Sequence, residues 1–172
     1  MVRLFVCQIC GEPYLGASID DCPFCGAPEK YLKTIEDYSK VWDVELTGQE
    51  KSDMKETLDL EVNAAAYYKK VSEANEKYSK MDRLFKQFAR VEEEHAEVAA
   101  KFLGVEEPEL KGEDPKGSPQ KDLERTKELE DAAVEKYRNF LKNASNPKVK
   151  KFYDALIHAE EGHAQIASED LK

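Results

Sequence analysis

Two similar segments of the sequence carry the residues best suited to bind a metal. Residues 92–96 read EEEHA, and residues 160–164 repeat the pattern as EEGHA. In an α-helix, residues three apart lie on one face, so the first glutamate of each segment lies beside its histidine. The candidate ligands in these segments are Glu92, His95, Glu160 and His163. Carboxylate and imidazole groups together suit transition-metal ions such as iron and manganese.

A second repeat supplies two more carboxylates. Glu61 precedes Tyr68 by about two helical turns, and Glu130 precedes Tyr137 in the same way. All four glutamates share a helix face with apolar residues, and burying them without cations would cost several kcal/mol per ion. One Glu from each of two helices plus Glu-x-x-His from each of two others is the ligand set of carboxylate-bridged di-iron and di-manganese sites.

These residues also have less specific interpretations. A single Glu-x-x-His in a glutamate-rich helix is usually exposed surface, but here the motif occurs twice, each time with an inward Glu-x6-Tyr segment. Tyr68 and Tyr137 either donate hydrogen bonds to ligating carboxylates or pack as core aromatics. Glu94, Glu97 and His158 are predicted to face water or the rim of the bundle and to bind no metal.

The four cysteines form a second candidate metal site. Cys7 and Cys10 make one Cys-x2-Cys-Gly segment, and Cys22 and Cys25 make another. Because no cysteine occurs after Cys25, the pattern favours a metal site in a reducing compartment over two disulfides. Four thiolates from two such pairs suit Zn²⁺ or a single iron ion. The spacing does not choose the metal, and taken alone it favours a structural zinc site.

Four helices are needed to present the carboxylates and imidazoles. The first helix is predicted to begin at a capping box of Thr47 with Glu50 and to end near Lys77. The second is predicted to begin between Ser79 and Asp82 and to end at Gly104. The third and fourth are predicted to begin at N-caps followed by proline, Ser118-Pro119 and Asn146-Pro147. Residues 105–117 are long enough to cross the bundle lengthwise, which gives ferritin-like connectivity. The alternative is a disordered loop between two separate hairpins.

The predicted organisation is a small metal module over residues 1–35, a linker over 36–46 and a four-helix bundle over 47–172. Val2, Leu4 and Val6 alternate as a short strand before the first cysteine. The 172 residues include 36 acidic and 26 basic ones, and the net charge of −10 argues against a nucleic-acid partner. No apolar run is long enough to span a membrane, and the first six residues are too short for a secretory signal, so we expect a cytoplasmic protein.

Taken together, these motifs resemble those of rubrerythrins. The two cysteine segments, with the run 22–28 (CPFCGAP), resemble their rubredoxin-like module, and the bundle ligands resemble those of their ferritin-like di-iron domain. The implied fold is an all-α ferritin-like four-helix bundle preceded by a small rubredoxin-like metal module with four cysteine ligands. Rubrerythrins commonly carry that module after the bundle, so this order resembles the reverse type.

The resemblance implies a non-haem peroxidase that reduces hydrogen peroxide to water and protects against oxidative stress. Its cofactors would be an oxo- and carboxylate-bridged di-iron centre and a mononuclear Fe(Cys)4 site. A rubredoxin or a flavin-dependent NAD(P)H reductase would supply the electrons, and two chains would cooperate in a homodimer. The residues expected to take part in catalysis are Glu61, Tyr68, Glu92, His95, Glu130, Tyr137, Glu160 and His163.

The sequence departs from rubrerythrins on the third helix. There the family typically has an additional glutamate three residues after the ligand, where this sequence has Ala133. In the family, this extra carboxylate replaces a histidine ligand of one iron on oxidation. This sequence lacks the carboxylate for that exchange, and its absence somewhat favours an oxidase or ferroxidase that uses O2. The sequence also leaves open a manganese catalase, which has no use for an electron-transfer module, and an iron-binding or storage protein with a structural Zn(Cys)4 site.

Overall fold

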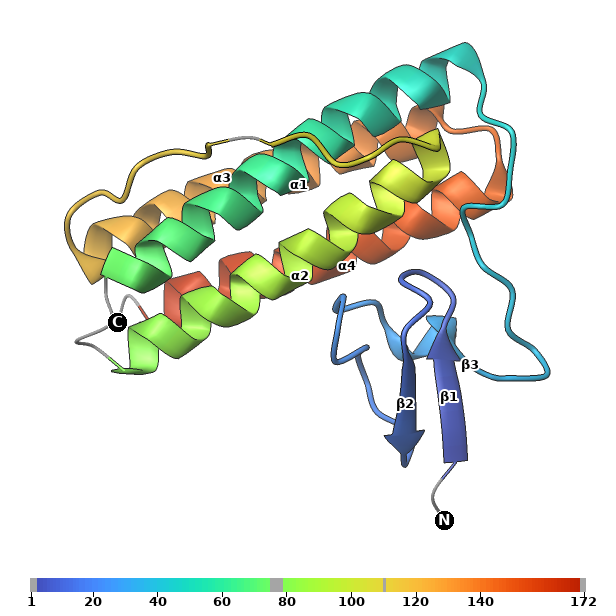
Figure 1. The fold of residues 1–172 in the computed structure, drawn as a ribbon, viewed down its shortest axis with the longest axis horizontal. Coiled ribbons are helices and arrows are strands. Elements are labelled where there is room, and N and C mark those ends of the chain that lie inside the picture. The colour runs from blue at the N-terminus through green and yellow to red at the C-terminus, as the bar shows by residue number, and fades with distance from the viewer. Residues whose placement is uncertain (1–2, 75–78, 110, 171–172) are drawn as a thin grey trace.

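A computed structural model of the chain describes residues 3–74, 79–109 and 111–170, and it confirms the predicted four-helix bundle (Figure 1). The helices are α1 (Gly48–Ala74), α2 (Ser79–Leu103), α3 (Pro119–Asn143) and α4 (Pro147–Asp170). α1 packs mainly on α2, and α3 on α4, so both predicted hairpins form. Lys77, the predicted end of the first helix, and Val2 of the predicted strand lie outside the described residues.

The predicted helix boundaries rest on local hydrogen bonds. The Glu50 N–H donates to Thr47 Oγ1 over 3.2 Å, and the Thr47 N–H donates to Glu50 Oε2 over 2.9 Å, which completes the capping box. The side chains of Ser118 and Asn146 accept from backbone amides in the first turns of α3 and α4, over 3.3 and 2.9 Å. α2 ends before Gly104, whose φ is 65°. These signals are local, which is why the sequence alone locates them.

The connection between α2 and α3 runs along the bundle, as its length predicted (Figure 1). Gly112 lies so close to α1 that a Cβ there would be 2.6 Å from the backbone nitrogen of Tyr67. The next residue, Glu113, accepts a hydrogen bond from Arg125 Nε of α3 over 3.0 Å. The crossover therefore contacts both hairpins, and the alternative of a disordered loop between two separate hairpins is wrong.

The N-terminal module is a three-stranded antiparallel sheet with the strand order β2-β1-β3. Its elements are β1 (Arg3–Cys7), β2 (Pro13–Gly16), the 3-10 helix η1 (Glu29–Tyr31) and β3 (Leu32–Thr34). Only β1 was predicted from the sequence. Residues 36–46 contain turns and bends but no helix or strand.

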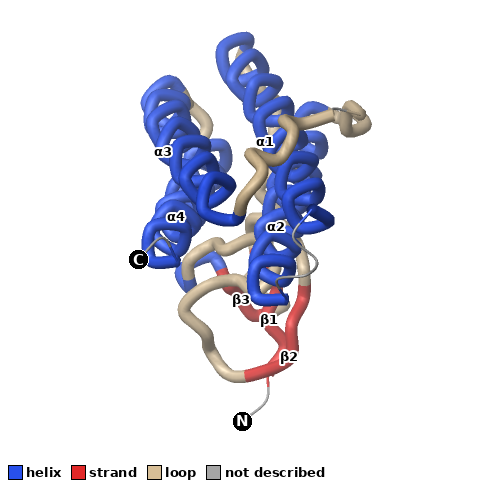
Figure 2. Tube along the Cα trace, turned by 90° about the vertical axis from the view of Figure 1, so that its left-hand side faces the viewer, coloured by secondary structure: helices blue, strands red, loops and turns tan. Residues whose placement is uncertain are grey.

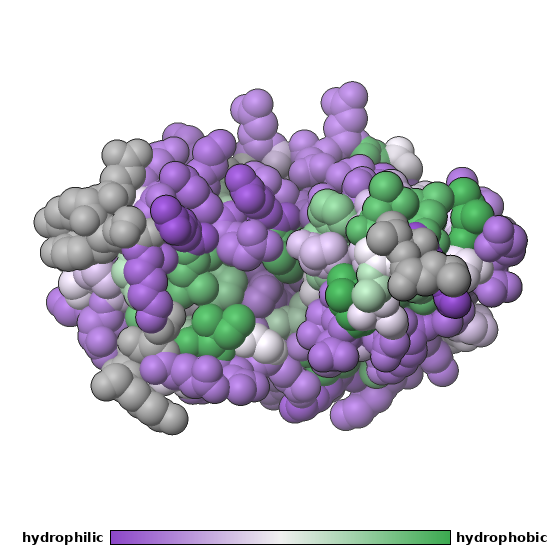
Figure 3. All heavy atoms as spheres, turned by 90° about the horizontal axis from the view of Figure 1, so that it is seen from below, coloured by the Kyte–Doolittle hydropathy of each residue, from purple (hydrophilic) through white to green (hydrophobic). Residues whose placement is uncertain are grey.

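The sheet module packs against α2 and α4 (Figures 1 and 2). Its buried residues belong to the same apolar cluster as residues of the bundle. The Tyr31 hydroxyl donates to Asp154 Oδ2 of α4 over 2.6 Å, and Lys30 Nζ lies 2.6 Å from the same oxygen. Seen from below, the surface is mostly hydrophilic, with hydrophobic residues gathered around the sheet (Figure 3), where Leu4 and Leu15 are exposed. Module and bundle thus share one core.

The Glu50→Gln substitution is expected to destabilise the fold by about 2 kcal/mol, because hydrogen bonds to a buried charge are lost. Glu50 Oε1 also accepts from the backbone amides of Ser145 and Asn146, which ties α1 to the turn between α3 and α4. Although burial opposes it, hydrogen bonds from backbone amides lower the pKa of Glu50 from 4.5 to about 2. The stabilisation is therefore complete above pH 4.5 and is lost as the pH falls toward 2.

The measurement is urea unfolding of both proteins between pH 2 and 7, and the exposed Glu45→Gln serves as the control. A wild-type-minus-variant difference that stayed constant across this range would contradict the role of the Glu50 charge.

Candidate metal centres

Six side chains from the four helices meet in the interior of the bundle. They are Glu61 of α1, Glu92 and His95 of α2, Glu130 of α3, and Glu160 and His163 of α4, and all are buried. Their ligand atoms form two groups, and within each group every atom lies within 4.8 Å of the others. Glu92 and Glu160 belong to both groups; Glu61 and His95 complete the first, and Glu130 and His163 the second. This arrangement fits two metal ions that share two carboxylates.

The two shared carboxylates offer one oxygen to each half of the site. His95 Nδ1 lies 3.0 Å from Glu92 Oε2 and 3.1 Å from Glu160 Oε1. His163 Nδ1 lies 3.0 Å from the opposite oxygens, Glu92 Oε1 and Glu160 Oε2. Bridging carboxylates present their oxygens in this alternating way, and both imidazoles face the site through Nδ1.

Tyr68 and Tyr137 each contact the carboxylate of the opposite hairpin. Tyr68 donates a hydrogen bond to Glu130 Oε1, and Tyr137 donates one to Glu61 Oε1. Burial, followed by the charge of the accepting glutamate, raises the pKa of both phenols, so both remain protonated donors. The sequence repeat associated each tyrosine with the glutamate two turns before it. The structure instead pairs them across α1 and α3, which lie side by side in antiparallel directions (Figure 1).

Several polar atoms in this cluster lack the partners that a metal would supply. Among the described residues, the buried side-chain atoms of this cluster without a well-directed hydrogen bond are Glu92 Oε1, both carboxylate oxygens of Glu160, and His163 Nδ1. Their nearest charged neighbours are the imidazole nitrogens and carboxylate oxygens 3.0–3.1 Å away. Burial raises the pKa of Glu61 to about 8 and that of Glu130 well above its ordinary range. Buried carboxylates need either protons or cations. The donor set therefore fits two divalent metal ions.

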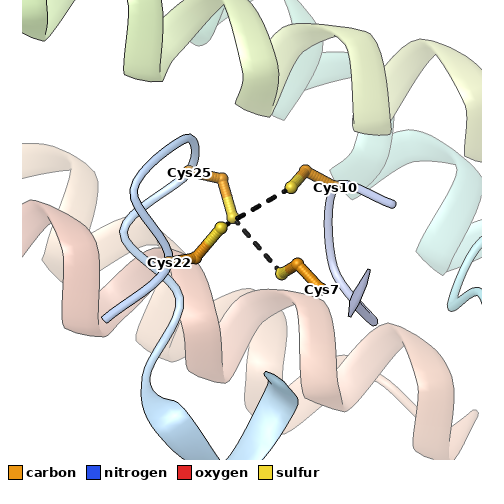
Figure 4. A group of neighbouring side chains, drawn as sticks. All are labelled: Cys7, Cys10, Cys22 and Cys25. Carbon is orange, nitrogen blue, oxygen red and sulfur yellow. Dashed lines mark hydrogen bonds between the residues drawn. The ribbon is translucent and has the colours of Figure 1, made fainter. Parts of the chain in front are cut away.

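The four cysteine sulfurs of the sheet module turn toward one point (Figure 4). Cys7 Sγ lies 3.7 Å from Cys25 Sγ, and Cys10 Sγ lies 3.8 Å from Cys22 Sγ. A tetrahedral site with metal–sulfur bonds of about 2.3 Å has sulfur–sulfur edges of about 3.8 Å. Hydrogen bonds from the other three thiols lower the pKa of Cys22, so one thiolate is favoured before a metal binds. The spacing therefore fits one tetrahedral ion.

Glycine is required after each cysteine pair. Gly11 has a φ of 87° and Gly26 a φ of 68°, a region that residues with a Cβ rarely adopt. The Gly11 N–H donates to the Cys7 carbonyl over 2.9 Å, and the Gly26 N–H donates to the Cys22 carbonyl over 3.0 Å. These turns bring both thiols of each pair to the same side.

One contact joins the two clusters, and the sequence carried no signal for it. His95 Nε2 lies 2.8 Å from the backbone carbonyl of Cys25. If Nδ1 binds a metal, Nε2 carries the proton and donates to this carbonyl, which fixes the orientation of the ring. One hydrogen bond therefore separates a cysteine of the sheet module from a histidine of the bundle cluster, within a single chain.

The residues predicted to lie outside the site are indeed elsewhere. Glu97 is exposed and pairs with Lys101 over 2.7 Å, and His158 pairs on the surface with Asp21 over 2.6 Å. Glu94 belongs to neither metal-binding group among the described residues. Ala133 lies one helical turn after Glu130 and lines a cavity that reaches the cluster.

Comparison with known families decides the identity of this arrangement. The rubrerythrin family model matches residues 54–167, a range that includes all six carboxylate and imidazole residues of the cluster. The chain belongs to the rubrerythrin family. No curated protein and no solved structure matches it significantly.

The rubrerythrin match confirms the predicted ferritin-like domain. The four-cysteine module before it is consistent with the reverse-type arrangement of rubrerythrins, and both clusters fit iron binding. Within the described ranges, no helix is long and apolar enough to cross a membrane.

Metal uptake by this rubrerythrin bundle is expected to release about four protons at pH 7, because the ligands must lose theirs. Burial keeps Glu61 and Glu130 protonated, as their raised pKa values indicate. Although burial opposes it, the charge of Glu160 raises the pKa of His95, and that of Glu92 raises the pKa of His163. Without metal, two imidazolium ions thus neutralise two carboxylates.

The measurement is calorimetric titration with Mn²⁺ in buffers of different ionisation enthalpy, after the four-cysteine site has been filled with zinc. Fewer protons should be released at pH 9, because Glu61 loses its proton near pH 8. Release of fewer than about two protons at pH 7 would contradict these protonation states.

Proposed function

We propose that this chain is a non-haem di-iron peroxidase that reduces hydrogen peroxide to water with electrons received through an Fe(Cys)4 site. Family membership supports an oxidoreductase in general terms. The observation that carries the finer proposal is the hydrogen bond between His95 Nε2 and the Cys25 carbonyl. A storage protein needs no such connection between a thiolate site and a carboxylate site.

The residues of the bundle have separate tasks in this reaction. Bound iron would supply two electrons to the peroxide and a Lewis-acidic position for it. Glu92 and Glu160 would hold both ions, since each faces both halves of the site. Tyr68 and Tyr137 keep the outer carboxylates oriented through hydrogen bonds from hydroxyls that stay protonated.

The cluster has a cavity on one side and packed aromatic rings on another. A cavity between α1 and α3 reaches Glu61, Glu130 and Glu160, so a small oxidant can approach the carboxylates from there. On the α2 side, the ring of Phe88 lies 4.9 Å from that of His163, and Phe85 packs behind it. Peroxide is therefore expected to enter between α1 and α3.

Electrons would pass from the four-cysteine site along a short path of covalent bonds and one hydrogen bond. It runs from Cys25 Sγ through the residue's own backbone carbonyl, across the hydrogen bond to His95 Nε2, and through the imidazole to Nδ1. Contacts of Tyr31 and Lys30 with Asp154 hold the module in this position. The path lies within one chain, so it does not itself depend on the homodimer.

The proposal retains the partners that the family resemblance implies. A rubredoxin or a flavin-dependent NAD(P)H reductase would reduce the four-cysteine site, and the role would be protection against oxidative stress in the cytoplasm. A homodimer is part of this proposal.

The test is anaerobic stopped-flow mixing of the fully reduced, metal-quantified protein with hydrogen peroxide and with O2 in separate experiments. We expect faster oxidation by peroxide. Much faster oxidation by O2 would contradict the peroxidase function and support the oxidase or ferroxidase, which the absence of a glutamate at Ala133 favours. A colourless four-cysteine site in the isolated protein would favour the storage protein with structural zinc, since ferric thiolate sites are red.

A further inference from the structure

The cavity between α1 and α3 extends beyond the space that the metal ions and hydrogen peroxide require. Its volume, which is open to solvent on one side and includes the space beside Glu61, Glu130 and Glu160, is about 430 Å³, whereas a water molecule in the liquid occupies about 30 Å³. It lies between the two helices that carry the single glutamates, and Gly112 and Glu113 of the crossover line its edge. Figure 2 shows α1 and α3 at this side of the bundle, with the crossover loop beside them. Peroxide or O2 at the carboxylates would leave the part of the cavity beside Ala64, Ala133 and the crossover unfilled.

The walls of the cavity are apolar close to the carboxylates. They are formed by Leu60, Ala64, Tyr67, Leu129, Ala133 and Tyr137. Both alanines lie one helical turn after a ligand glutamate, at equivalent positions of the two sequence repeats, and both are half-buried. A larger apolar residue at either position would fill the space and bury more apolar surface. The two repeats instead both keep a methyl group, which leaves room for a ligand.

We infer that this cavity binds the organic group of a small alkyl or aryl hydroperoxide, whose peroxide end reaches Glu61, Glu130 and Glu160. This inference rests on the proposed peroxidase function and specifies its substrate class. The substrate R–O–O–H takes up two electrons and two protons, its O–O bond breaks, and R–OH and H2O leave. The reduced iron ions of the proposed function supply the electrons, and solvent supplies the protons. A ligand pocket of this size is ordinary, and an apolar wall beside a few polar groups would orient such a substrate.

The first test measures binding without any reaction. The probe is 2-phenyl-2-propanol, the alcohol that forms from cumene hydroperoxide, and the protein is the full chain loaded with diamagnetic zinc. Methyl NMR spectra of alanine-labelled protein should show shifts at Ala64 and Ala133 on titration, and none at the exposed Ala132. Shifts confined to other methyl groups, or no shifts, would overturn the inference.

The second test is a pair of substitutions on the same helix. Ala133→Leu should weaken binding of the alcohol by about tenfold or more, because the added methyl groups occupy the cavity. The matched control Ala132→Leu should bind like the wild type, since that side chain is exposed. If Ala133→Leu does not fold, Ala64→Leu on the opposite wall makes the same comparison. Equal affinities of the wall variant and the control would overturn the inference.

The third test separates this inference from the proposed function. The iron-loaded, reduced wild type is mixed with hydrogen peroxide and with cumene hydroperoxide, and the ratio of the two oxidation rates is compared between Ala133→Leu and Ala132→Leu. A ratio that falls for cumene hydroperoxide only in Ala133→Leu supports the inference. Oxidation by hydrogen peroxide alone in the wild type overturns it and leaves the peroxidase standing. Oxidation by neither peroxide overturns both, and the zinc-protein binding data then show whether the cavity takes an apolar ligand at all.

Discussion

Replacing Glu160 with alanine is expected to weaken binding of both metal ions in the bundle by on the order of 100-fold or more, since loss of a ligand costs more than loss of a ligand's hydrogen-bond partner. Glu160 belongs to both ligand groups and faces the Nδ1 atoms of both histidines. Its loss removes a ligand from each ion and leaves Glu92 as the one carboxylate that faces both imidazoles. The metal-dependent rise in melting temperature should disappear as well, because binding to the folded state alone produces it.

The number of metal ions retained by Glu160→Ala is compared with the number retained by Glu130→Ala. Glu130 belongs to only one of the two groups, so its variant should retain one ion per bundle. Glu161→Ala is the matched control, since this neighbouring glutamate is exposed and pairs with Arg138. Metal content after desalting, read by elemental analysis, gives the stoichiometry. Two ions retained by Glu160→Ala, or none by Glu130→Ala, would refute the assignment of shared and unshared carboxylates.

Zinc in the four-cysteine site, with iron in the bundle, is expected to slow steady-state peroxide reduction by at least about 100-fold, because Zn²⁺ has no redox chemistry. The fold and the His95–Cys25 contact should survive, since the thiolate spacing fits a tetrahedral ion of either metal. A single oxidation of the chemically pre-reduced bundle should proceed at the wild-type rate. Only the transfer of further electrons from the donor to the bundle should be lost.

The measurement combines stopped-flow oxidation with turnover driven by a reduced rubredoxin. Asp154→Ala provides an intermediate case, because it removes the acceptor for Tyr31 and Lys30 and loosens the module on α4. It should slow turnover while leaving the single oxidation intact. Full turnover of the zinc-substituted protein would show that electrons reach the bundle without the four-cysteine site.

The sequence by itself determined the members of both metal sites. Helical periodicity requires that Glu92 and His95 share a face, as do Glu160 and His163, and the repeated pattern distinguishes them from surface glutamates. Cys-x2-Cys-Gly spacing likewise brings two thiols together within one turn. The helix boundaries were predictable for the same reason, since a capping residue acts within one turn of its own position.

Only the tertiary structure decided how those members combine. It showed that Glu92 and Glu160 are the shared carboxylates, and that Tyr68 and Tyr137 reach the opposite hairpin. The sequence also did not predict the strands β2 and β3 or the cavity between α1 and α3.

The contact of His95 with Cys25 is another feature that only the tertiary structure shows. It joins residues far apart in the chain, and its length depends on how the sheet module packs against α2 and α4. Sequence spacing fixes geometry over one or two helical turns, where the backbone is rigid. Beyond that range the packing of whole elements sets the distances, and packing is a property of the complete fold.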